Sequence, residues 1–413
     1  MPCHIPEAAC VMANTSFILT QEQLVTTARI LSERIRKGLE TPDLEILAIP
    51  TYLPVENIPH TGRALVVDLG GTNVRAAVVS LSGGQLIFEK GPVSTAIPIQ
   101  RNIPLEKERF LNHLAELIAS LDPPDGLPLG YCFSYPTLST PDGDATLIRW
   151  TKEVSVNGTV NEKVGHMLVE HLATFRKPVK CSSVAVINDT VACLLGGLPA
   201  VEADGYIGLI VGTGNNVALV VDAHAVPKLP KEFNWHWPLP INLESGNFDP
   251  PYLTTFDDQL DAESEKPGHH RFEKAVSGVY LAKVLKLACP ESRVDVALGA
   301  KAVVDVAYKT GTPSSKEYEL AHQILQRSAD LVAASLAGTI DILASAHACK
   351  KIGIVAEGGL FWGCPDYKKW TDAALRAVLD AMGHSQIAFE IVSVENANLT
   401  GSAVGALSEY KAA

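Results

Sequence analysis

The sequence predicts an α/β protein with two domains, each built on a mixed sheet flanked by helices. Its 413 residues exceed what one ordinary hydrophobic core holds, so two domains are expected. Apolar strand-like segments alternate with helical segments in two successive blocks, and the pattern restarts after Thr190. A turn rich in Gly, Thr and Asn, lying between two apolar strands, occurs once in each block.

In the first block, apolar residues at helical spacing predict a helix over 17–40, with Thr20 as its N-cap and its end near Gly38. The dipeptide Gly83-Gly84 between two apolar segments is typical of a β-hairpin. The other elements expected here are strands in ALVVDLG (64–70), VRAAVVSL (74–81) and QLIFEKGPV (85–93), a helix over 104–121, a buried strand in LPLGYCFSYP (127–136), a helix over 161–176 and a strand in VAVINDT (184–190).

The second block begins with the strands that carry its glycine turn. The elements expected there are a short helix over 190–196, strands in YIGLIVGTG (206–214) and NVALVVD (216–222), an irregular polar section over 223–270, helices over 272–288 and 317–346, a strand in KIGIVAEGG (351–359), a helix over 366–382, a strand in IAFEIVSV (387–394) and a final helix from Thr400.

Amino-acid composition and net charge limit the kinds of molecule that we expect this protein to bind. Apolar residues make up 47% and charged residues 19%, which is typical of a folded globular protein. The net charge of −12 argues against nucleic acid and anionic membranes, because both attract basic surfaces. The 8 cysteines are scattered without a CxxC pair, which favours reduced thiols and a cytoplasmic protein. We expect residues 1–16 to be flexible, without the features of a signal peptide, and no apolar run approaches the ~20 residues that span a bilayer.

The two glycine turns lie in VVDLGGTNVRAAVV (66–79) and LIVGTGNNVALVV (209–221). Gly70 and Gly71 permit positive φ and close approach of a ligand to the backbone, whose N–H groups can then surround a phosphate. The segment Gly212-Thr213-Gly214 offers the same chemistry. Two ordinary hairpins are the alternative, although the pairing of the turns favours a phosphate site. Neither turn has the P-loop pattern, and the second is not a dinucleotide fingerprint because a strand follows it.

Polar residues lie at the ends of two of the expected strands. Asp68 precedes the first turn, where its carboxylate either caps the turn or faces phosphates and their metal. Asn188 and Asp189 follow a buried strand, at the edge where α/β sheets bind ligands. The alternative for this pair is that it caps the next helix.

Taken together, these segments resemble the eukaryotic-type hexokinase/glucokinase family, over most of the chain from about residue 17. The resemblance rests on motifs that follow one another in the family's order. They are the lead-in RKGLETPDLEILAIPTYL (36–53), DLGGTNVR (68–75), FSYP (133–136), WTK (150–152), INDT (187–190), IGLIVGTGNNVA (207–218), INLESGNF (241–248), PGHHRFEKAVSGVYL (267–281) and TGSAVGAL (400–407).

The resemblance implies a two-domain actin-like ATPase (ribonuclease H-like) fold with a cleft between a small and a large domain. The small domain would comprise 62–190 plus 400–413, and the large domain 17–61 plus 191–399. It further implies ATP-dependent phosphorylation of the 6-hydroxyl of a hexose, with glucose the expected acceptor. Domain closure on the sugar would then complete the site and exclude water.

The family's functional residues can be placed on this sequence. The resemblance makes Asp189 the general base, puts Lys152 beside the transferred phosphoryl group and lets Asp68 hold Mg²⁺ through water. The positions matching the family's sugar site are Ser134, Tyr135, Pro136, Thr151, Lys152, Asn188, Asp189, Asn216, Glu244 and Glu273. Those expected to bind ATP are Asp68, Gly70, Gly71, Thr72, Asn73, Arg75, Gly212, Thr213, Gly214, Glu357, Gly358 and Gly359.

Several positions depart from the family pattern and leave the sugar preference open. Tyr135 stands where Phe is usual, Glu153 where Gly is usual and Ser245 where Trp is common, while AEGG (356–359) replaces an Asp-Gly-Ser stretch. Arg75 either adds charge to the nucleotide site or is a surface residue. The alternatives to a glucose kinase are a kinase for mannose, fructose or an amino sugar, and a sugar sensor with little catalysis. The expected partners are a hexose and ATP, with no nucleic acid or membrane, in a monomer or homodimer.

Overall fold

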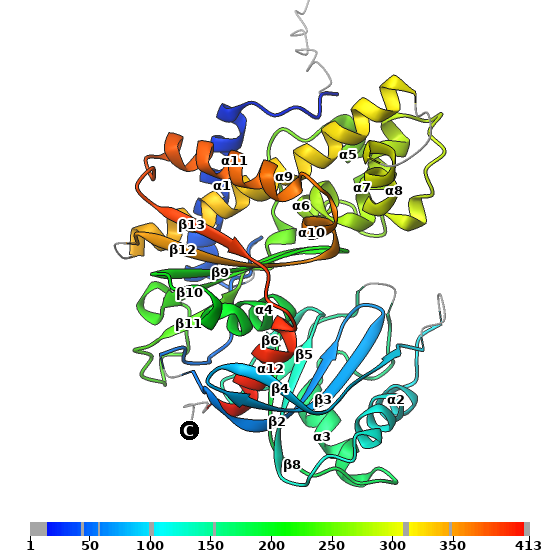
Figure 1. Cartoon of the computed structure of the whole chain (residues 1–413), viewed down its shortest axis with the longest axis vertical. Coiled ribbons are helices and arrows are strands. Elements are labelled where there is room, and N and C mark those ends of the chain that lie inside the picture. Colours follow the sequence, from blue (N-terminus) through cyan, green and yellow to red (C-terminus); the bar gives the residue numbers. More distant parts are fainter. Residues whose placement is uncertain are drawn as a thin grey trace, which may run out of the picture.

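The computed structural model describes residues 15–42, 45–56, 58–98, 103–151, 154–308, 314–346 and 349–408. Two sheets, each with its own helices, are stacked along the long axis of the molecule (Figure 1). The helices and strands are mixed in both halves, so the predicted α/β class with mixed sheets is confirmed. The expected flexible segment falls almost wholly on residues 1–14, outside the described residues.

The five-stranded sheet has the order β4-β3-β2-β5-β8. Strand β2 pairs antiparallel with β3 and parallel with β5, so this sheet is mixed. Its strands are β2 (Thr61–Leu69), β3 (Asn73–Ser82), β4 (Gln85–Ala96), β5 (Leu127–Phe133) and β8 (Cys181–Ile187). As predicted, Gly83 and Gly84 form the β3–β4 hairpin turn, and both have positive φ.

The six-stranded sheet has the order β1-β11-β10-β9-β12-β13. Its strands are β1 (Ile49–Pro50), β9 (Gly205–Val211), β10 (Asn215–Asp222), β11 (Pro238–Asn242), β12 (Lys351–Glu357) and β13 (Ala388–Val392). Strands β9, β10 and β11 are antiparallel neighbours, and β9, β12 and β13 are parallel neighbours. The five-stranded sheet shows the same succession of directions, so one β arrangement occurs twice. In each copy a glycine turn joins two antiparallel strands, β2 to β3 in one and β9 to β10 in the other.

Both faces of the five-stranded sheet are covered, which explains the unbroken apolar run ALVVDL. Leu65, Val67 and Leu69 pack against the helices α2 (Lys107–Ser120) and α3 (Val164–Thr174). Ala64 and Val66 pack on the other face with α4 (Asp189–Gly197) and α12 (Ala397–Leu407). A short ribbon of β6 (Thr137–Ser139) and β7 (Ala145–Leu147) extends from β5.

Helices α4 and α12 lie between the two sheets (Figure 1). Helix α4 packs on the six-stranded sheet, α12 packs on the five-stranded sheet, and the two helices pack on each other. Glycine permits this close approach, because a Cβ atom at Gly401 would lie 1.9 Å from the carbonyl oxygen of Ala192. The two halves are therefore joined through a helix pair whose backbones touch.

The other face of the six-stranded sheet carries the largest core. Helix α1 begins after Thr20, whose side chain accepts from Gln23 N in a capping box, as the sequence predicted. The helices of this half are α1 (Gln21–Glu40), α5 (Thr255–Ala262), α6 (Arg271–Val276), α7 (Gly278–Ala288), α8 (Ala300–Tyr308), α9 (Ser315–Ala346), α10 (Gly359–Gly363) and α11 (Tyr367–Met382).

Two sequence predictions fail in this half. The section 223–270 was expected to be irregular, but it contains strand β11 and helix α5. The helix expected over 272–288 is broken at Ser277, which adopts extended backbone angles between α6 and α7. The break has a tertiary cause, because the amide of Gly278 donates to the carbonyl of Gly212, 2.7 Å away.

Helix α9 is the one described helix long and apolar enough to cross a membrane, judged by length and composition. Of its most apolar 18-residue window, 72% is buried inside the protein, and core helices pass the same test. It packs against α1, α7, α8 and α11, so its apolar character is explained by the core. The six cysteines within the described ranges are free.

Candidate active site

The first glycine turn joins β2 to β3 and places a buried carboxylate next to an arginine. Asp68 is opposite Arg75 in the antiparallel ladder, and Arg75 Nη2 lies 2.6 Å from Asp68 Oδ2. The side chain of Asp68 is 8% exposed, whereas that of Arg75 is 39% exposed. The turn is closed by Gly70 N donating to Asn73 O at 3.0 Å, and the hydroxyl of Tyr135 donates to Gly70 O at 2.9 Å. Thr72 and Asn73 are exposed beside it.

The second glycine turn joins β9 to β10 and is held by other parts of the same half. Gly212 N donates to Gly214 O at 2.9 Å, and Thr213 is exposed at the tip. A Cβ atom at Gly358 would lie 2.1 Å from the carbonyl oxygen of Val211, and one at Gly214 would lie 2.7 Å from Glu273 Oε2. Gly359 follows directly as the first residue of α10.

Close approach explains one glycine of the second turn, Gly214, and the neighbouring Gly358, whereas a Cβ atom at Gly70 would meet nothing nearer than 3.5 Å. Positive φ was one reason given for the glycines of the turns, but Gly70, Gly212 and Gly214 do not adopt it. At Gly214 the lack of a side chain makes room for a glutamate, and at Gly358 it lets two backbone segments touch.

Helix α4 begins at the end of β8 and presents Asp189 as its first residue. Asn188 is the N-cap, and its Oδ1 accepts from Thr190 N at 2.9 Å, so the capping interpretation of this residue is confirmed. Asp189 Oδ1 accepts from the same amide at 2.8 Å. The positive end of the helix dipole favours a carboxylate at this position.

Carboxylates from both sheets converge near the start of α4. Glu357, at the end of β12, has its pKa raised to about 7, mainly by burial and further by the negative charges of Asp68 and Asp189, while Arg75 opposes the shift. Cys132 of β5 pairs with Asp68 in the sheet, and its pKa is raised well above the usual value by burial and by Asp68 and Asp189. The first turn, the second turn and Asp189 therefore border one acidic region.

A polar network lies behind the second turn. Asn216 Nδ2 donates to Asn242 Oδ1 at 2.8 Å, and Asn242 Nδ2 donates to Glu244 Oε1 at 2.9 Å. Asn216 Oδ1 accepts from Ser245 N at 3.1 Å. Glu244 is held with φ 54, the left-handed region that a non-glycine residue seldom adopts, immediately before Ser245. Asn242 was not singled out from the sequence, yet it connects two residues that were.

Glu273 connects α6 to the second turn, because its Oε2 accepts from Asn215 N at 3.1 Å. Of the candidates from the five-stranded half, Ser134 N donates to Leu69 O at 3.1 Å, and the carbonyl of Pro136 accepts from Ile148 N at 3.0 Å. The carbonyl of Thr151 accepts from Val154 N at 3.1 Å. Lys152 lies outside the described residues.

Several buried side-chain atoms around this region have no hydrogen-bond partner within the described part of the chain. They are Asn215 Oδ1, Ser245 Oγ, Ser277 Oγ and Arg149 Nε. Buried polar atoms are normally satisfied by protein, ordered water or ligand. Their position beside Glu273, Glu244, Gly278 and Thr151 fits a site that takes a ligand with many hydroxyl groups.

The donor set also fits a magnesium ion that binds together with phosphates. In the described residues, no group of three or more His, Cys, Asp or Glu side chains could hold a metal ion on its own. Mg²⁺ is usually bound by one or two carboxylates, with water and phosphate oxygens as the other ligands. Asp68, buried beside the first turn, can supply such a ligand directly or through water.

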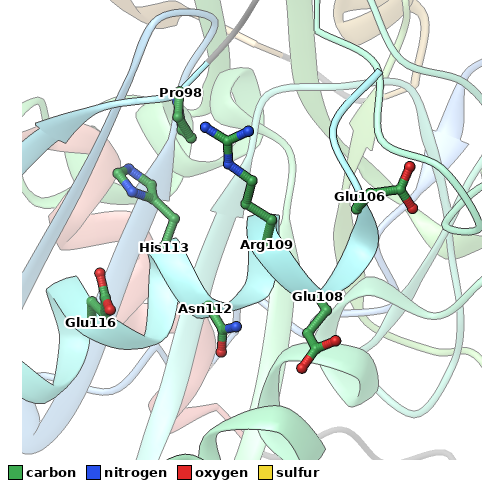
Figure 2. A pocket seen from close by; sticks show the side chains of 7 residues that line it. All are labelled: Pro98, Glu106, Glu108, Arg109, Asn112, His113 and Glu116. Atoms are coloured by element: carbon green, nitrogen blue, oxygen red, sulfur yellow. The ribbon is translucent and has the colours of Figure 1, made fainter. Parts of the chain in front are cut away.

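Two surface hollows lie elsewhere, along α2. One, of about 500 Å³, is lined by Pro98, Glu106, Glu108, Arg109, Asn112, His113 and Glu116. Figure 2 shows Arg109 and His113 extending from α2 toward Pro98, whereas Glu108 and Asn112 extend the other way. The second, of about 680 Å³, adds His171, Thr174, Phe175 and Arg176. Neither contains a predicted site residue, and the side chains shown in Figure 2 do not converge on one point.

Two copies of one mixed sheet, each with a glycine turn, define an α/β protein with the actin-like ATPase fold. Family models described as "Hexokinase" match residues 11–198 and residues 206–299 and 300–408. The chain belongs to the hexokinase family, whose enzymes phosphorylate hexoses.

Individual relatives agree with this assignment. Hexokinase-2 of Candida albicans is 29% identical over 447 aligned residues, covering 96% of this chain and 91% of its own length. Hexokinase-1 of Spinacia oleracea is 36% identical over 254 residues, an alignment that spans 56% of this chain and about half of that protein (49%). The solved hexokinase of Schistosoma mansoni, complexed with glucose, has a TM-score of 0.77 at 24% identity and covers 94% of this chain and 96% of its own. At that identity the likeness shows the fold.

Proposed function

We propose that this protein transfers the terminal phosphoryl group of ATP to the 6-hydroxyl of a hexose, with D-glucose as its main acceptor. One observation carries the proposal. Glu357, beside the second glycine turn, lies within electrostatic range of both Asp68, beside the first, and Asp189, at the start of α4. The proposed base therefore stands where the two phosphate-binding turns come together.

Asp189 is proposed to accept the proton of the attacking hydroxyl. The amide of Thr190 donates to its Oδ1 at 2.8 Å and so holds the carboxylate in place, as a positioned general base requires. Lys152 keeps its expected role of offsetting charge on the transferred group. Asp68 would hold Mg²⁺, directly or through water, and the ion would supply charge that offsets that of the phosphates.

The phosphates would contact backbone amides of both turns, with the hydroxyls of Thr72 and Thr213 as further donors. Gly70, Gly71 and Asn73 belong to the first turn, and Gly212 and Gly214 to the second. Arg75 is already near the phosphate site through its pair with Asp68. Glu357, Gly358 and Gly359 were expected beside the adenosine. The negative charges of Asp68 and Asp189 act on Glu357, which supports a place near the phosphates for its side chain.

The sugar is proposed to bind between the Asn216–Asn242–Glu244 network, Glu273 and the residues Ser134, Thr151 and Asn188. Each hexose hydroxyl both donates and accepts, and this set supplies carboxylates, amides and hydroxyls from both halves. A relative of the same fold, the Schistosoma mansoni hexokinase, was solved with glucose. That precedent supports glucose as the first acceptor to test.

Closure of the two halves on the sugar is part of the proposal, since the ligands come from both. The division expected from the sequence, 62–190 with the final helix against the remainder, gives the two moving parts. Closure would exclude water that could otherwise accept the phosphoryl group.

The test is an assay of the purified chain with ATP, Mg²⁺ and a panel of glucose, mannose, fructose and glucosamine, in which ADP formation is followed. We expect saturable turnover that is highest with glucose. Faster turnover with another member of the panel would replace glucose as the acceptor. Saturable sugar binding by calorimetry without ADP formation would indicate a sugar-binding regulator and contradict the proposal.

A further inference from the structure

A contact between the two halves involves Arg149 and His270, neither of which is among the residues assigned above to the sugar, the phosphates or the catalytic base. Arg149 follows β7 in the half built on the five-stranded sheet, and His270 directly precedes α6 in the other half. Arg149 Nη2 lies 2.9 Å from His270 Nε2, across 121 positions of sequence. A guanidinium group only donates, so Nε2 of His270 accepts and the imidazole is neutral.

The surroundings of His270 keep it in that neutral form. Its pKa is lowered to about 4, first by burial and then by the positive charge of Arg149, with smaller effects from His269, Lys274 and Lys266. The acceptor is therefore available throughout the neutral range. His270 is also held with φ 54, a left-handed conformation, at the point where α6 begins.

Each partner is fixed to its own half. On one side, Arg271 Nη2 lies 2.5 Å from Asp258 Oδ1, and Lys274 Nζ lies 2.6 Å from Asp261 Oδ1, which ties the start of α6 to α5. On the other side, Trp150 Nε1 donates to Thr159 Oγ1 at 2.8 Å, and the Trp150 ring meets Tyr135 edge-on with centroids 4.7 Å apart. The hydrogen bond thus joins two well-anchored segments.

Both segments lead directly to proposed sugar ligands. Thr151 lies two residues beyond Arg149, and Glu273 lies three residues beyond His270, in the first turn of α6. Glu273 accepts from Asn215 N at 3.1 Å, so a shift of α6 would also disturb the second glycine turn. The Nε atom of Arg149 is buried without a partner among the described residues, which leaves one donor of the same guanidinium for a bound molecule or water.

We propose that Arg149 and His270 are a pair of positioning residues whose hydrogen bond sets the distance between Thr151 and Glu273, and thereby the affinity of the sugar site. The inference rests on the proposed function, because it concerns the hexose site of that reaction. The pair acts through its neighbours, so its loss should weaken sugar binding while leaving ATP binding as it was.

The experiment is a double-mutant cycle with Arg149→Met and His270→Ala, in which glucose affinity is measured by calorimetry and kcat and both KM values by the ADP assay. Each single variant should raise the dissociation constant and the KM for glucose about tenfold, because hydrogen bonds to charged groups are the stronger kind. The KM for ATP should change less than twofold. The double variant should be no weaker than the worse single one, since both lose the same contact.

Two further variants keep the test decisive. His270→Gln retains a side-chain acceptor and should restore glucose affinity to within about threefold of the unmodified chain, which a purely structural role would not predict. Arg176→Met removes an exposed pair with Glu116 on the same half and should leave every constant unchanged. Melting temperatures of all variants identify loss of folding.

The outcomes separate the two proposals. Independent, multiplicative effects of Arg149→Met and His270→Ala would overturn the inference, as would an equal rise in the KM for ATP or no rescue by His270→Gln in a folded protein. If the unmodified chain neither binds nor phosphorylates any hexose, the proposed function fails and the inference fails with it. If the unmodified chain phosphorylates a hexose normally but the effects of Arg149→Met and His270→Ala are independent, the inference fails and the proposed function stands.

Discussion

Asp68 and Arg75 are cross-strand neighbours in the β2–β3 ladder, and the guanidinium Nη2 lies 2.6 Å from the carboxylate Oδ2. The pair holds a negative and a positive group side by side next to the first glycine turn. A metal–phosphate ligand could bind both at once, the cation near Asp68 and a phosphate near Arg75.

Replacing Asp68 by Asn should therefore raise the Mg²⁺ concentration needed for half-maximal rate and lower kcat/KM for ATP by about tenfold or more, because an amide lacks the charge that a hard cation prefers. Glucose affinity should stay within twofold. Rates across a Mg²⁺ series and calorimetry with glucose measure the two effects. Glu89→Gln is the control, since it makes the same change in an exposed pair with Arg63 on the same sheet. An unchanged Mg²⁺ requirement in Asp68→Asn would exclude the metal role.

Replacing Asp189 by Ala should lower kcat by at least ~10²-fold, the lower end of what loss of a general base costs, while glucose binding stays measurable. Asp189→Asn is the matched variant, because its side chain can still accept from Thr190 N and preserve the start of α4. Single-turnover rates and calorimetry provide the measurements. Near-normal turnover in either variant would reject the base assignment.

Replacing Asn242 by Ala should raise the KM for glucose about tenfold and leave the KM for ATP unchanged. The substitution removes the side chain that accepts from Asn216 Nδ2 and donates to Glu244 Oε1, so the network loses both of these hydrogen bonds. Asn112→Ala on α2, which removes a contact with His171 far from the site, is the control. A rise in both KM values would show that Asn242 supports the whole half and not the sugar network.

Replacing Thr213 by Val should weaken ATP more than sugar, because Thr213 lies exposed at the tip of the second turn and its hydroxyl is proposed to donate to phosphate. We expect a several-fold rise in the KM for ATP and no change in glucose affinity. Steady-state kinetics with each substrate varied in turn gives the comparison. Equal effects on both substrates would count against the phosphate assignment.

The raised pKa of Glu357 predicts a pH-dependent contribution to stability. In the folded protein this pKa is about 7, above the ordinary value of 4.5, so between these values the folded state holds more protons than the unfolded state. Stability from this group is then fully present below about pH 4.5 and is lost as the pH rises through about 7. Glu357→Gln cannot lose a proton. Its melting temperature relative to the unmodified chain should therefore increase by a few °C from pH 5 to pH 8.

Comparing the melting temperatures of Glu357→Gln and the unmodified chain at each pH removes the effect of other titrating groups. Asp330, whose pKa burial raises to about 7, and His270, whose pKa is lowered to about 4, are present in both and cancel in the difference. A melting-temperature difference that stays constant from pH 5 to pH 8 would show that Glu357 does not titrate there.

Much of the fold could be predicted because local chemistry fixes it. The capping residue Thr20, the glycine hairpin at 83–84 and the two strand–turn–strand segments each depend on residues close in sequence. Strands alternating with helices in two blocks also predicted a mixed sheet in each half, which the strand pairings confirm.

The failures have tertiary causes. The break at Ser277 comes from the hydrogen bond between Gly278 and Gly212, 66 positions apart, which apolar periodicity along α6 and α7 cannot reveal. Strand β11 was missed because its sequence, PLPIN, contains two prolines, yet it pairs with both β10 and β1.

The candidate site was predictable only in part. Polar residues at strand ends identified Asp68, Asn188 and Asp189, and the resemblance supplied Glu244 and Glu273. Asn242 and the Arg149–His270 contact depend on pairings that only the folded chain shows. The roles assigned to the site residues, the domain boundaries, the oligomeric state and the cytoplasmic location stay predictions.

The touching backbones of α4 and α12 limit how the protein can flex. With Gly401 against the carbonyl of Ala192, sliding one helix lengthwise would drive bulkier neighbours into that carbonyl, whereas a small rotation about the crossing point keeps the contact. The helix pair can therefore act as the hinge about which one half rotates relative to the other. A small rotation at this contact would displace the tips of the distant hairpins much farther than it displaces the two helices.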